Sequence, residues 1–373
     1  FLVKIKFIMK VGIIGNNLTC LVLAKALVNQ HIFVDIFYKD KKIIVDKTRT
    51  IGISKSNVDY FNKNISNISK FLWPIKKIKI YSENSNNKEI IGFENQRENL
   101  FSIAENYKIF NQLITELKNN KFFKYKNTIS YNNLNKINCD LLINCDQENE
   151  ITKKFFFQKF EKKYESIAYT TLIDHKTLPS NDVAIQIFTK RGPMAFLPVS
   201  NKRTSIVYSV QTKKFDNAFD IKNSIMKFNL SYQIKKINKV SKFNLKSSNL
   251  RKYYKNNILA FGDLLHKLHP LAGQGFNMTL RDIKILLELI TNRIELGLPL
   301  DQSICIEFQK KVKSNNLIFS EIIQEKLNLG LPLDVSVNEE FEKKSKHSNY
   351  IFSNGIDFIY EFFNLERKVK SKI

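Results

Sequence analysis

The stretch that decides the fold is residues 262–282, GDLLHKLHPLAGQGFNMTLRD. It follows a short apolar run, Asn257–Phe261, with the composition of a buried strand, and it leads into a predicted helix over Asn277–Ile290. Asp263 therefore stands at the carboxyl end of a strand, where open α/β sheets bind their ligands. The two glycines of the loop let backbone N–H groups approach a ligand, and the helix N-terminus adds roughly half a positive charge. This pattern favours a site for a pyrophosphate or for the electron-rich edge of a reduced flavin.

The start of the chain carries a second nucleotide-binding pattern. Lys10–Ile14 and Ile32–Tyr38 are predicted strands, and the apolar stretch Leu18–Val28 is a predicted helix between them. This strand–helix–strand opening is typical of a Rossmann-like domain. Further along, residues 54–72 are predicted to be helical and Pro74–Tyr81 to form a strand.

The pattern changes to short strands from about residue 166 to residue 210. The predicted strands are Ser166–Ile173, Asp182–Phe188, Met194–Pro198 and Thr204–Gln211. Short strands after an α/β opening predict a second domain that is inserted into the first.

Together these segments resemble the FAD-dependent ubiquinone-biosynthesis hydroxylases, which are aromatic-ring flavoprotein monooxygenases of the para-hydroxybenzoate hydroxylase fold. Residues 262–277 are similar to the family signature GD-x-x-H-x-x-HPLAGQG-x-N. Four shorter stretches agree in order: residues 48–56 with an arginine-containing segment, 74–78 with the first substrate-domain strand, 192–198 with a GP-x-A-x-LP turn, and 352–354 with a C-terminal motif.

The resemblance implies an α/β fold in which a three-layer Rossmann-like FAD-binding domain carries an inserted mixed β-sheet substrate domain and ends in C-terminal helices. We expect a discontinuous FAD-binding domain over residues 1–73, 98–165 and 252–300. The substrate domain is expected over residues 74–97 and 166–251, and a C-terminal helical region over residues 301–373.

The same resemblance assigns the residues that bind the cofactor. They are Gly15, Asn17, Arg49, Asp146, Asp263, Pro270, Gly273, Gln274, Gly275 and Asn277. Asp263 is expected at the ribityl chain of FAD, and Arg49 is expected to face the flavin. His266 and His269 also match the signature, and both a loop-fastening and a catalytic role stay open for them. No catalytic residue is assigned, because hydroxyl transfer from a flavin needs no protein nucleophile.

Two family motifs are altered in this sequence. The first glycine loop should read G-x-G-x-x-G, but Asn17 and Cys20 replace its second and third glycines. Asn17 puts a side chain where the backbone should meet the pyrophosphate, and Cys20 adds volume where helix and strand should pack closely. Tyr38 stands where a ribose-binding acid is expected. Asp146 keeps the acid of a G-A-D-G motif, but Gln147 replaces its last glycine.

The function that the resemblance implies is FAD-dependent hydroxylation of the aromatic ring of a polyprenylated phenol in ubiquinone biosynthesis. Dioxygen would be the oxidant, and NADH, NADPH or another electron donor would reduce FAD. The altered motifs leave an alternative open: a flavin-free or weakly flavin-binding accessory subunit of a quinone-biosynthesis complex. Hydroxylation of a soluble aromatic acid is a further alternative.

The composition bears on partners and location. The net charge is +25, but 52 of the 60 basic residues are Lys. Nucleic acid is therefore not an expected partner, because Arg is the residue that reads guanine and clamps phosphates. Codon composition in an A+T-rich genome explains much of the charge, although a Lys-rich surface also attracts anionic lipid.

Other features of the sequence argue for a reducing compartment. The four cysteines show no paired spacing and no His cluster, so neither a metal site nor a disulfide framework is expected. We expect a cytoplasmic protein, with contact to the inner face of the membrane left open. An aromatic stripe within Tyr350–Leu365 predicts a helix that packs on its own domain or lies on a membrane interface.

Overall fold

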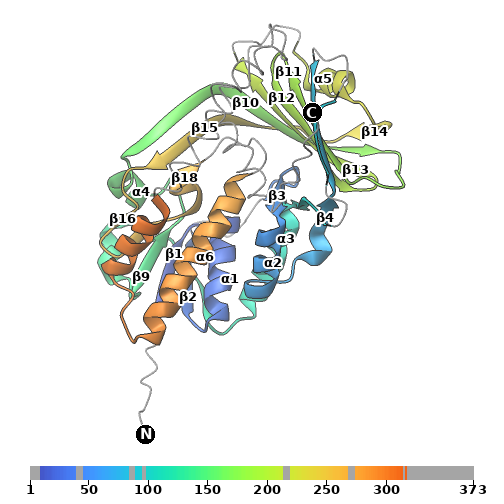
Figure 1. Cartoon of the computed structure of the whole chain (residues 1–373). Helices are drawn as coiled ribbons and strands as arrows, with labels where there is room; N and C mark the ends of the chain where they lie inside the picture. The colour runs from blue at the N-terminus through green and yellow to red at the C-terminus, as the bar shows by residue number, and fades with distance from the viewer. Residues whose placement is uncertain are drawn as a thin grey trace, which may run out of the picture.

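The computed structural model describes residues 9–38, 45–83, 89–94, 98–212, 219–267, 274–313 and 316. Three β-sheets organise these residues, and Figure 1 shows how the helices are arranged around them. The aromatic stripe predicted within residues 350–365 lies outside the described residues.

The first sheet is the parallel sheet of the nucleotide-binding domain. Its strand order is β16-β17-β9-β1-β2-β8. The bounds are β16 Tyr254–Lys255, β17 Ile258–Ala260, β9 Leu141–Asn144, β1 Lys10–Ile14, β2 Phe33–Tyr38 and β8 Phe123–Asn127. Every neighbouring pair from β17 to β8 is parallel, and β16 alone runs antiparallel to β17. The strands β1 and β9 are buried on both faces, which explains their continuous apolar sequences.

Helices cover this parallel sheet. They are α1 Leu18–Asn29, α3 Asn106–Lys118, the short α4 Glu150–Phe155 and the long α6 Gln274–Glu295. In Figure 1, α1 and α6 lie side by side in front of β1 and β2. Ten of the twelve residues of α1 are buried, because the helix packs against the sheet and against both α3 and α6. The predicted strand–helix–strand opening is present.

The second sheet is mixed and corresponds to the predicted inserted sheet. Its order is β18-β15-β10-β13-β12-β11-β5-β6, and β14 pairs with β10. The bounds are β5 Lys77–Ser82, β6 Glu89–Glu94, β10 Lys159–His175, β11 Val183–Thr189, β12 Gly192–Ser200, β13 Arg203–Gln211, β14 Ile234–Ile237, β15 Ser241–Leu250 and β18 His266–Lys267. β5 and β11 are parallel, and the other pairs are antiparallel. Helix α5, Ile221–Phe228, closes a core on one face, where Ile206, Tyr208 and Phe196 are almost fully buried.

A small antiparallel sheet, in the order β3-β7-β4, lies between the other two. Its strands are β3 Thr50–Ser54, β7 Phe101–Glu105 and β4 Leu72–Ile75, and the helix α2 Lys55–Asn64 follows β3. Ile75 and Ile103 pack with Ala184 of the mixed sheet in a separate apolar cluster. The remaining described elements are the 3-10 turns Ser69–Phe71, Tyr131–Lys136 and Gly262–Leu264 and a helical segment over residues 302–313.

Two local expectations were wrong. The helix predicted over residues 54–72 ends at Asn64, after which a 3-10 turn leads into β4. The single strand predicted over Pro74–Tyr81 is divided between β4 in the small sheet and β5 in the mixed sheet. Residues 72–75 are continuously apolar and residues 77–80 alternate, and neither pattern shows that the chain changes sheets at Lys76.

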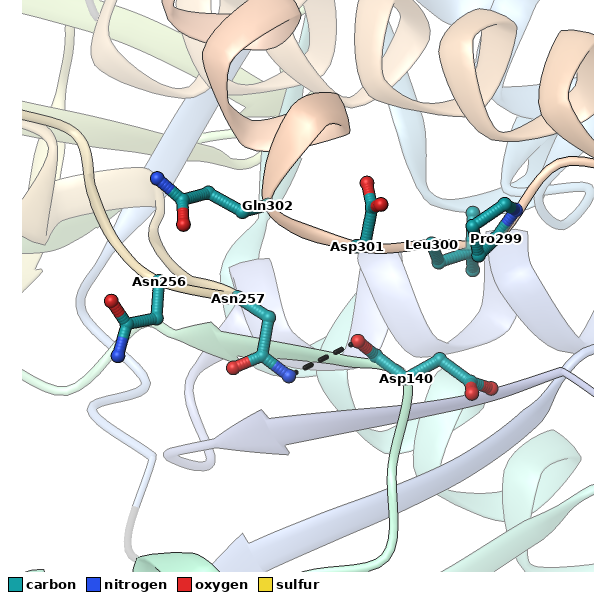
Figure 2. A pocket seen from close by; sticks show the side chains of 7 residues that line it. All are labelled: Asp140, Asn256, Asn257, Pro299, Leu300, Asp301 and Gln302. Atoms are coloured by element: carbon teal, nitrogen blue, oxygen red, sulfur yellow. Dashed lines mark hydrogen bonds between the residues drawn. The ribbon is translucent and has the colours of Figure 1, made fainter.

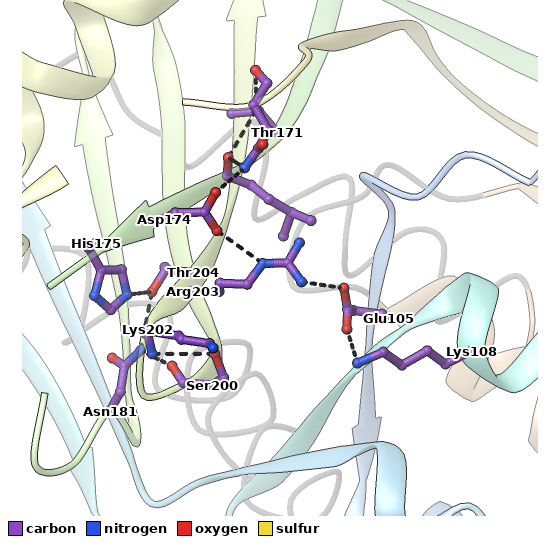
Figure 3. Close-up of polar contacts among 12 residues, drawn as sticks. Glu105, Lys108, Thr171, Asp174, His175, Asn181, Ser200, Lys202, Arg203 and Thr204 are labelled. Atoms are coloured by element: carbon purple, nitrogen blue, oxygen red, sulfur yellow. Dashed lines mark hydrogen bonds and ion pairs between the residues drawn. The ribbon is translucent and has the colours of Figure 1, made fainter. Parts of the chain in front are cut away.

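Ionic contacts join the mixed sheet to the nucleotide-binding part of the chain (Figure 3). Glu105, at the end of β7, is only 4% exposed. Its carboxylate lies 3.4 Å from Arg203 Nη1 of β13 and also contacts Lys108 of α3. Arg203 Nε in turn lies 3.2 Å from Asp174 Oδ1 of β10. Because an unpaired buried carboxylate is strongly destabilising, these contacts favour one relative position of the two sheets.

The Gly-Pro turn of residues 192–193 is explained by the backbone of the mixed sheet. Gly192 has a φ of +140°, and a Cβ there would collide with the backbone oxygen of Ser209. Gly297 also has a positive φ, of +66°, but nothing lies within 4 Å of the position of its Cβ.

We therefore expect Gly192→Ala to lower the free energy of unfolding by roughly 2–4 kcal/mol, because strain and a backbone clash add. Gly297→Ala is the matched control and should cost only roughly 1–2 kcal/mol, from strain alone. Urea unfolding followed by circular dichroism measures both. Equal costs for the two variants would contradict this explanation of the turn.

Candidate cofactor-binding site

The three central strands of the parallel sheet end side by side. Ile14 of β1 pairs with Asn144 of β9, which pairs with Ala260 of β17. The segments that follow these strands carry Gly15, Asp146 and Asp263, three of the residues predicted to bind the cofactor. They therefore meet at the carboxyl edge of the sheet, as expected for a ligand site in an open α/β sheet.

Two glycines at this edge are required by the backbone. Gly15 has a φ of +116° and Gly262 a φ of +61°. A Cβ on Gly262 would lie 2.8 Å from Thr19 Cγ2, so the loop after β17 passes directly over the first turn of α1. This close approach brings the segment of Asp263 to the N-terminus of α1.

The loops at the edge are held together by side-chain hydrogen bonds. Gln147, which replaces a motif glycine, donates from Nε2 to the backbone oxygen of Asp263 at 2.7 Å. The carboxylate of Asp146 accepts from the backbone N–H of Glu148 at 2.8 Å and so shapes its own turn. The side chain of Asp263 is exposed, and no described residue hydrogen-bonds to its carboxylate. Of the two acids, Asp263 is the one available to ligand hydroxyls.

Asn17 makes two hydrogen bonds within the altered glycine loop and its surroundings. Its Oδ1 accepts from the backbone N–H of Cys20 at 3.0 Å, which makes Asn17 the N-cap of α1. Its Nδ2 donates to the backbone oxygen of Cys145 at 3.3 Å. Cys20 itself is fully buried beneath the loop, with Sγ 4.0 Å from the backbone oxygen of Ile14, so it lies in the core and not on the ligand side.

The residues at this edge fit a dinucleotide cofactor. The cap leaves the first amides of α1, those of Leu18 and Thr19, without an intrahelical acceptor, and these amides suit a phosphate. Both side-chain polar atoms of Asn16 are buried and have no hydrogen-bond partner within the described ranges. A buried amide without partners is costly, and a polar ligand at the loop would satisfy it.

Asn16 was missed by sequence reasoning, because the glycine pattern treats its position as variable. Gln147 was treated only as the loss of a glycine. Both residues carry an amide side chain and lie shortly after a predicted strand. This position after a strand is the sequence signal that could have identified them.

Two predicted cofactor residues make protein contacts. Asn277 is 3% exposed; its Oδ1 accepts from the Ser54 backbone N–H and from Asn57, and its Nδ2 donates to the backbone oxygen of Gly52. These bonds hold the start of α6 against β3 and α2. Arg49 is exposed, and its guanidinium carbon lies 5.3 Å from the ring centre of Phe243 in β15.

Gln274 and Gly275 are the first two residues of α6. Pro270, Gly273 and His269 lie outside the described residues, so their predicted roles stay predictions. His266 Nε2 lies 2.6 Å from Asp282 Oδ2, and both side chains are almost fully buried. Of the two roles left open for His266, this contact supports the fastening of the loop to α6.

Nucleophilic cysteine chemistry is not favoured here. The pKa of the Cys145 thiol is raised well above its usual value by the hydrogen bond with Cys20 and by burial, and burial raises the pKa of Cys139 to about 11. Both groups therefore stay protonated near neutral pH. Within the described ranges, no cluster of three or more His, Cys, Asp or Glu side chains is arranged to hold a metal ion.

A surface pocket lies at the opposite edge of the parallel sheet (Figure 2). Asp140 and Asn257 precede β9 and β17, and residues 299–302 follow α6. Asn257 Nδ2 donates to the backbone oxygen of Asp140 at 3.2 Å across the pocket floor. Because this is the amino edge of the strands, the pocket is separate from the cofactor-binding edge.

The chain has the para-hydroxybenzoate hydroxylase fold, and this edge has the features of a dinucleotide-binding site. Residues 126–295 match the FAD binding domain family, FAD_binding_3. In structure, the chain is similar to HpxO of Klebsiella pneumoniae complexed with FAD and uric acid. The TM-score is 0.69 at 12% sequence identity, with 96% of this chain and 97% of that one covered.

Two curated proteins of similar sequence are named as enzymes of ubiquinone biosynthesis or ubiquinone hydroxylation. The chain is 25% identical over 220 residues to the mitochondrial ubiquinone biosynthesis monooxygenase COQ6 of Drosophila melanogaster, with 48% of this chain and 46% of COQ6 covered. It is 23% identical over 163 residues to the ubiquinone hydroxylase UbiL of Rhodospirillum rubrum, with 42% of this chain and 38% of UbiL covered. The match therefore spans less than half the length of these relatives. The resemblance to the ubiquinone-biosynthesis hydroxylases is confirmed over this part of the chain.

The geometry of Asn17 predicts the effect of restoring the family glycine. Asn17→Gly removes the capping side chain at the N-terminus of α1, so the backbone N–H of Cys20 becomes available to a phosphate. We expect FAD affinity to rise about tenfold, measured by quenching of flavin fluorescence on titration, and stability to fall by only a few tenths of a kcal/mol. Asn17→Ala is the control, because it removes the cap without relaxing the backbone. A weaker affinity for Asn17→Gly than for the unaltered chain would show that the Asn17 amide itself binds the cofactor.

Proposed function

We propose that the protein is an FAD-dependent monooxygenase that hydroxylates the aromatic ring of a polyprenylated phenol in ubiquinone biosynthesis. The observation that carries the proposal is the meeting of Gly15, Gly262 and the exposed carboxylate of Asp263 at the carboxyl edge of the parallel sheet. The names of the ubiquinone-biosynthesis relatives support the pathway.

The chain's own residues would bind and orient the cofactor. Asp263 would accept hydrogen bonds from its hydroxyl groups, and the amides of Leu18 and Thr19 at the start of α1 would face its phosphates. FAD, reduced by NADH, NADPH or another donor, supplies the oxygen-activating chemistry when bound. The protein then has to position the aromatic ring and exclude water.

The face of the mixed sheet opposite α5 supports an apolar substrate. Thr170, Val207 and Ala195 form a row of small, half-buried, uncharged side chains across β10, β13 and β12. Thr170 and Ser205 on this face touch the segment of Thr48 and Thr50, which leads into β3. An aromatic ring with an attached apolar chain would lie against these small side chains.

The charges near this face favour a phenol over an aromatic acid. A soluble aromatic acid needs a cation to pair with its carboxylate. Arg203 is already engaged by Glu105 and Asp174, and Arg49, a second cation beside this face, lies over the ring of Phe243. A polyprenylated phenol needs no such partner, and a neutral apolar surface suits it better.

A second candidate is an accessory subunit that binds flavin weakly or not at all. The observation that favours it is the Asn17 cap together with the Gln147 bridge to Asp263, because both use polar groups that a cofactor would otherwise meet. If the purified chain shows no saturable flavin binding in the titration described above, this candidate replaces the monooxygenase.

Quinone profiling of cells that lack the protein tests the proposal. We expect a polyprenylated precursor that lacks one hydroxyl group to accumulate and the final quinone to fall. Complementation with Asp263→Ala should restore less than about a tenth of the quinone that the unaltered chain restores, because the ligand loses a charge-assisted acceptor.

The control is Asp140→Ala, at the opposite edge of the same sheet. It removes the hydrogen bond from the Lys10 N–H, at a cost of roughly 1 kcal/mol, and should restore the quinone normally. Unchanged quinone pools in the deleted cells would contradict the assignment to ubiquinone biosynthesis. Full complementation by Asp263→Ala would contradict the cofactor role of Asp263.

A further inference from the structure

A two-stranded ribbon extends from α4 toward the mixed sheet. It is formed by the first part of β10 and the last part of β15, with Lys159–Lys163 paired to Lys246–Leu250. Figure 1 shows β10 beginning beside α4 and β16 before it joins the broad sheet. We call residues 157–164 and 246–252 the aromatic–basic ribbon.

Two phenylalanines of the ribbon face solvent. Phe157 is 63% exposed and Phe160 is 54% exposed, whereas their neighbour Phe156 is buried in the core. Neither exposed ring belongs to an apolar cluster of the described chain. Large apolar side chains that are exposed together mark an interaction surface more often than chance placement does.

Cations surround these rings. The guanidinium carbon of Arg251 lies 4.5 Å from the ring centre of Phe160, and Lys162 Nζ lies 5.7 Å from the ring centre of Tyr164. Glu161 is paired with Lys159 and Lys246. Among the described residues, no carboxylate lies within ion-pair distance of Lys162, Lys163 or Arg251. The ribbon therefore keeps unpaired positive charge beside its exposed aromatic rings.

The sequence around the ribbon also has an excess of positive charge. Residues 153–165 and 246–255 contain nine basic and two acidic side chains. A second copy of the chain would present the same positive charge and would be repelled. An anionic surface is the complementary partner, and one that also accepts apolar rings at its boundary is a lipid interface.

We propose that the aromatic–basic ribbon binds an anionic membrane surface. Phe157 and Phe160 enter the headgroup boundary, and Lys162 and Arg251, on the same face of the ribbon as Phe160, lie against lipid phosphates. In the part of the chain that the structure describes, no helix is long and apolar enough to cross a bilayer. The ribbon would make a reversible contact, and this contact does not depend on the proposed hydroxylation.

Co-sedimentation of the full chain with vesicles tests the proposal. We expect binding to phosphatidylcholine vesicles that contain phosphatidylglycerol, little binding to phosphatidylcholine alone, and weakening by added salt. Phe157→Ser with Phe160→Ser should lower the partition coefficient about tenfold, and Lys162→Gln with Arg251→Gln should lower it by a similar factor.

The controls change equally exposed residues elsewhere. Leu296→Ser with Leu298→Ser removes two exposed apolar side chains after α6, and Lys118→Gln with Lys121→Gln removes two charges at the end of α3. Both should bind vesicles like the unaltered chain, and circular dichroism should show all variants folded. Equal binding by the ribbon variants and the controls would overturn the proposal. Binding of a single-stranded oligonucleotide, lost in the ribbon variants without any vesicle binding, would assign the ribbon to nucleic acid and overturn it as well.

Discussion

The candidate site depends on one close approach: the backbone of Gly262 passes over Thr19 in the first turn of α1, where even a methyl group would lie 2.8 Å from Thr19 Cγ2. Ile14, Asn144 and Ala260 pair in register, so the three strands end next to one another. Because the loop after β17 also packs against α1, Asp263 and the N-terminus of α1 lie at the same edge of the sheet. A residue with a side chain at position 262 would separate the two motifs.

The glycine losses near this edge have structural replacements. Asn17 caps the helix that its glycine counterpart would leave open, and Gln147 ties the loop after β9 to the loop after β17. Cys20 is accommodated in the core beneath Gly15, so it does not take the place of a ligand. The loop is therefore held by side-chain hydrogen bonds where the family pattern relies on a bare backbone. These hydrogen bonds preserve the geometry of the site. Single substitutions at Asn17 or Gln147 would change its affinity for the cofactor.

The mixed sheet is tied to the nucleotide-binding layers at several separated points. β10 is a single strand of 17 residues that starts beside α4 and ends in the far sheet. Arg203 extends from β13 to the buried carboxylate of Glu105 (Figure 3). The hydroxyl of Ser205 also contacts that of Thr50. Because covalent continuity and polar contacts act together, the row of small side chains Thr170, Val207 and Ala195 has a defined position relative to the segment that leads into β3. A fixed relative position is required if the substrate surface of one domain is to hold an aromatic ring close to a cofactor bound by another domain.

The sequence by itself determined the α/β class, the strand–helix–strand opening and the importance of residues 262–282, because alternating and continuous apolar patterns and paired glycines are local signals. The family resemblance also assigned Gly15, Asp146 and Asp263 to one cofactor, and the structure places the segments that carry them at one edge of the sheet. Only the tertiary structure decided that Asn277 serves β3 and α2, that His266 pairs with Asp282, and that the stretch predicted as one strand changes sheets at Lys76. These outcomes depend on which partner a side chain meets across more than a dozen residues of sequence, and no local pattern encodes that partner. The exposed rings of Phe157 and Phe160 belong to the same group, because three consecutive phenylalanines look alike until the fold buries Phe156 and leaves Phe157 in solvent.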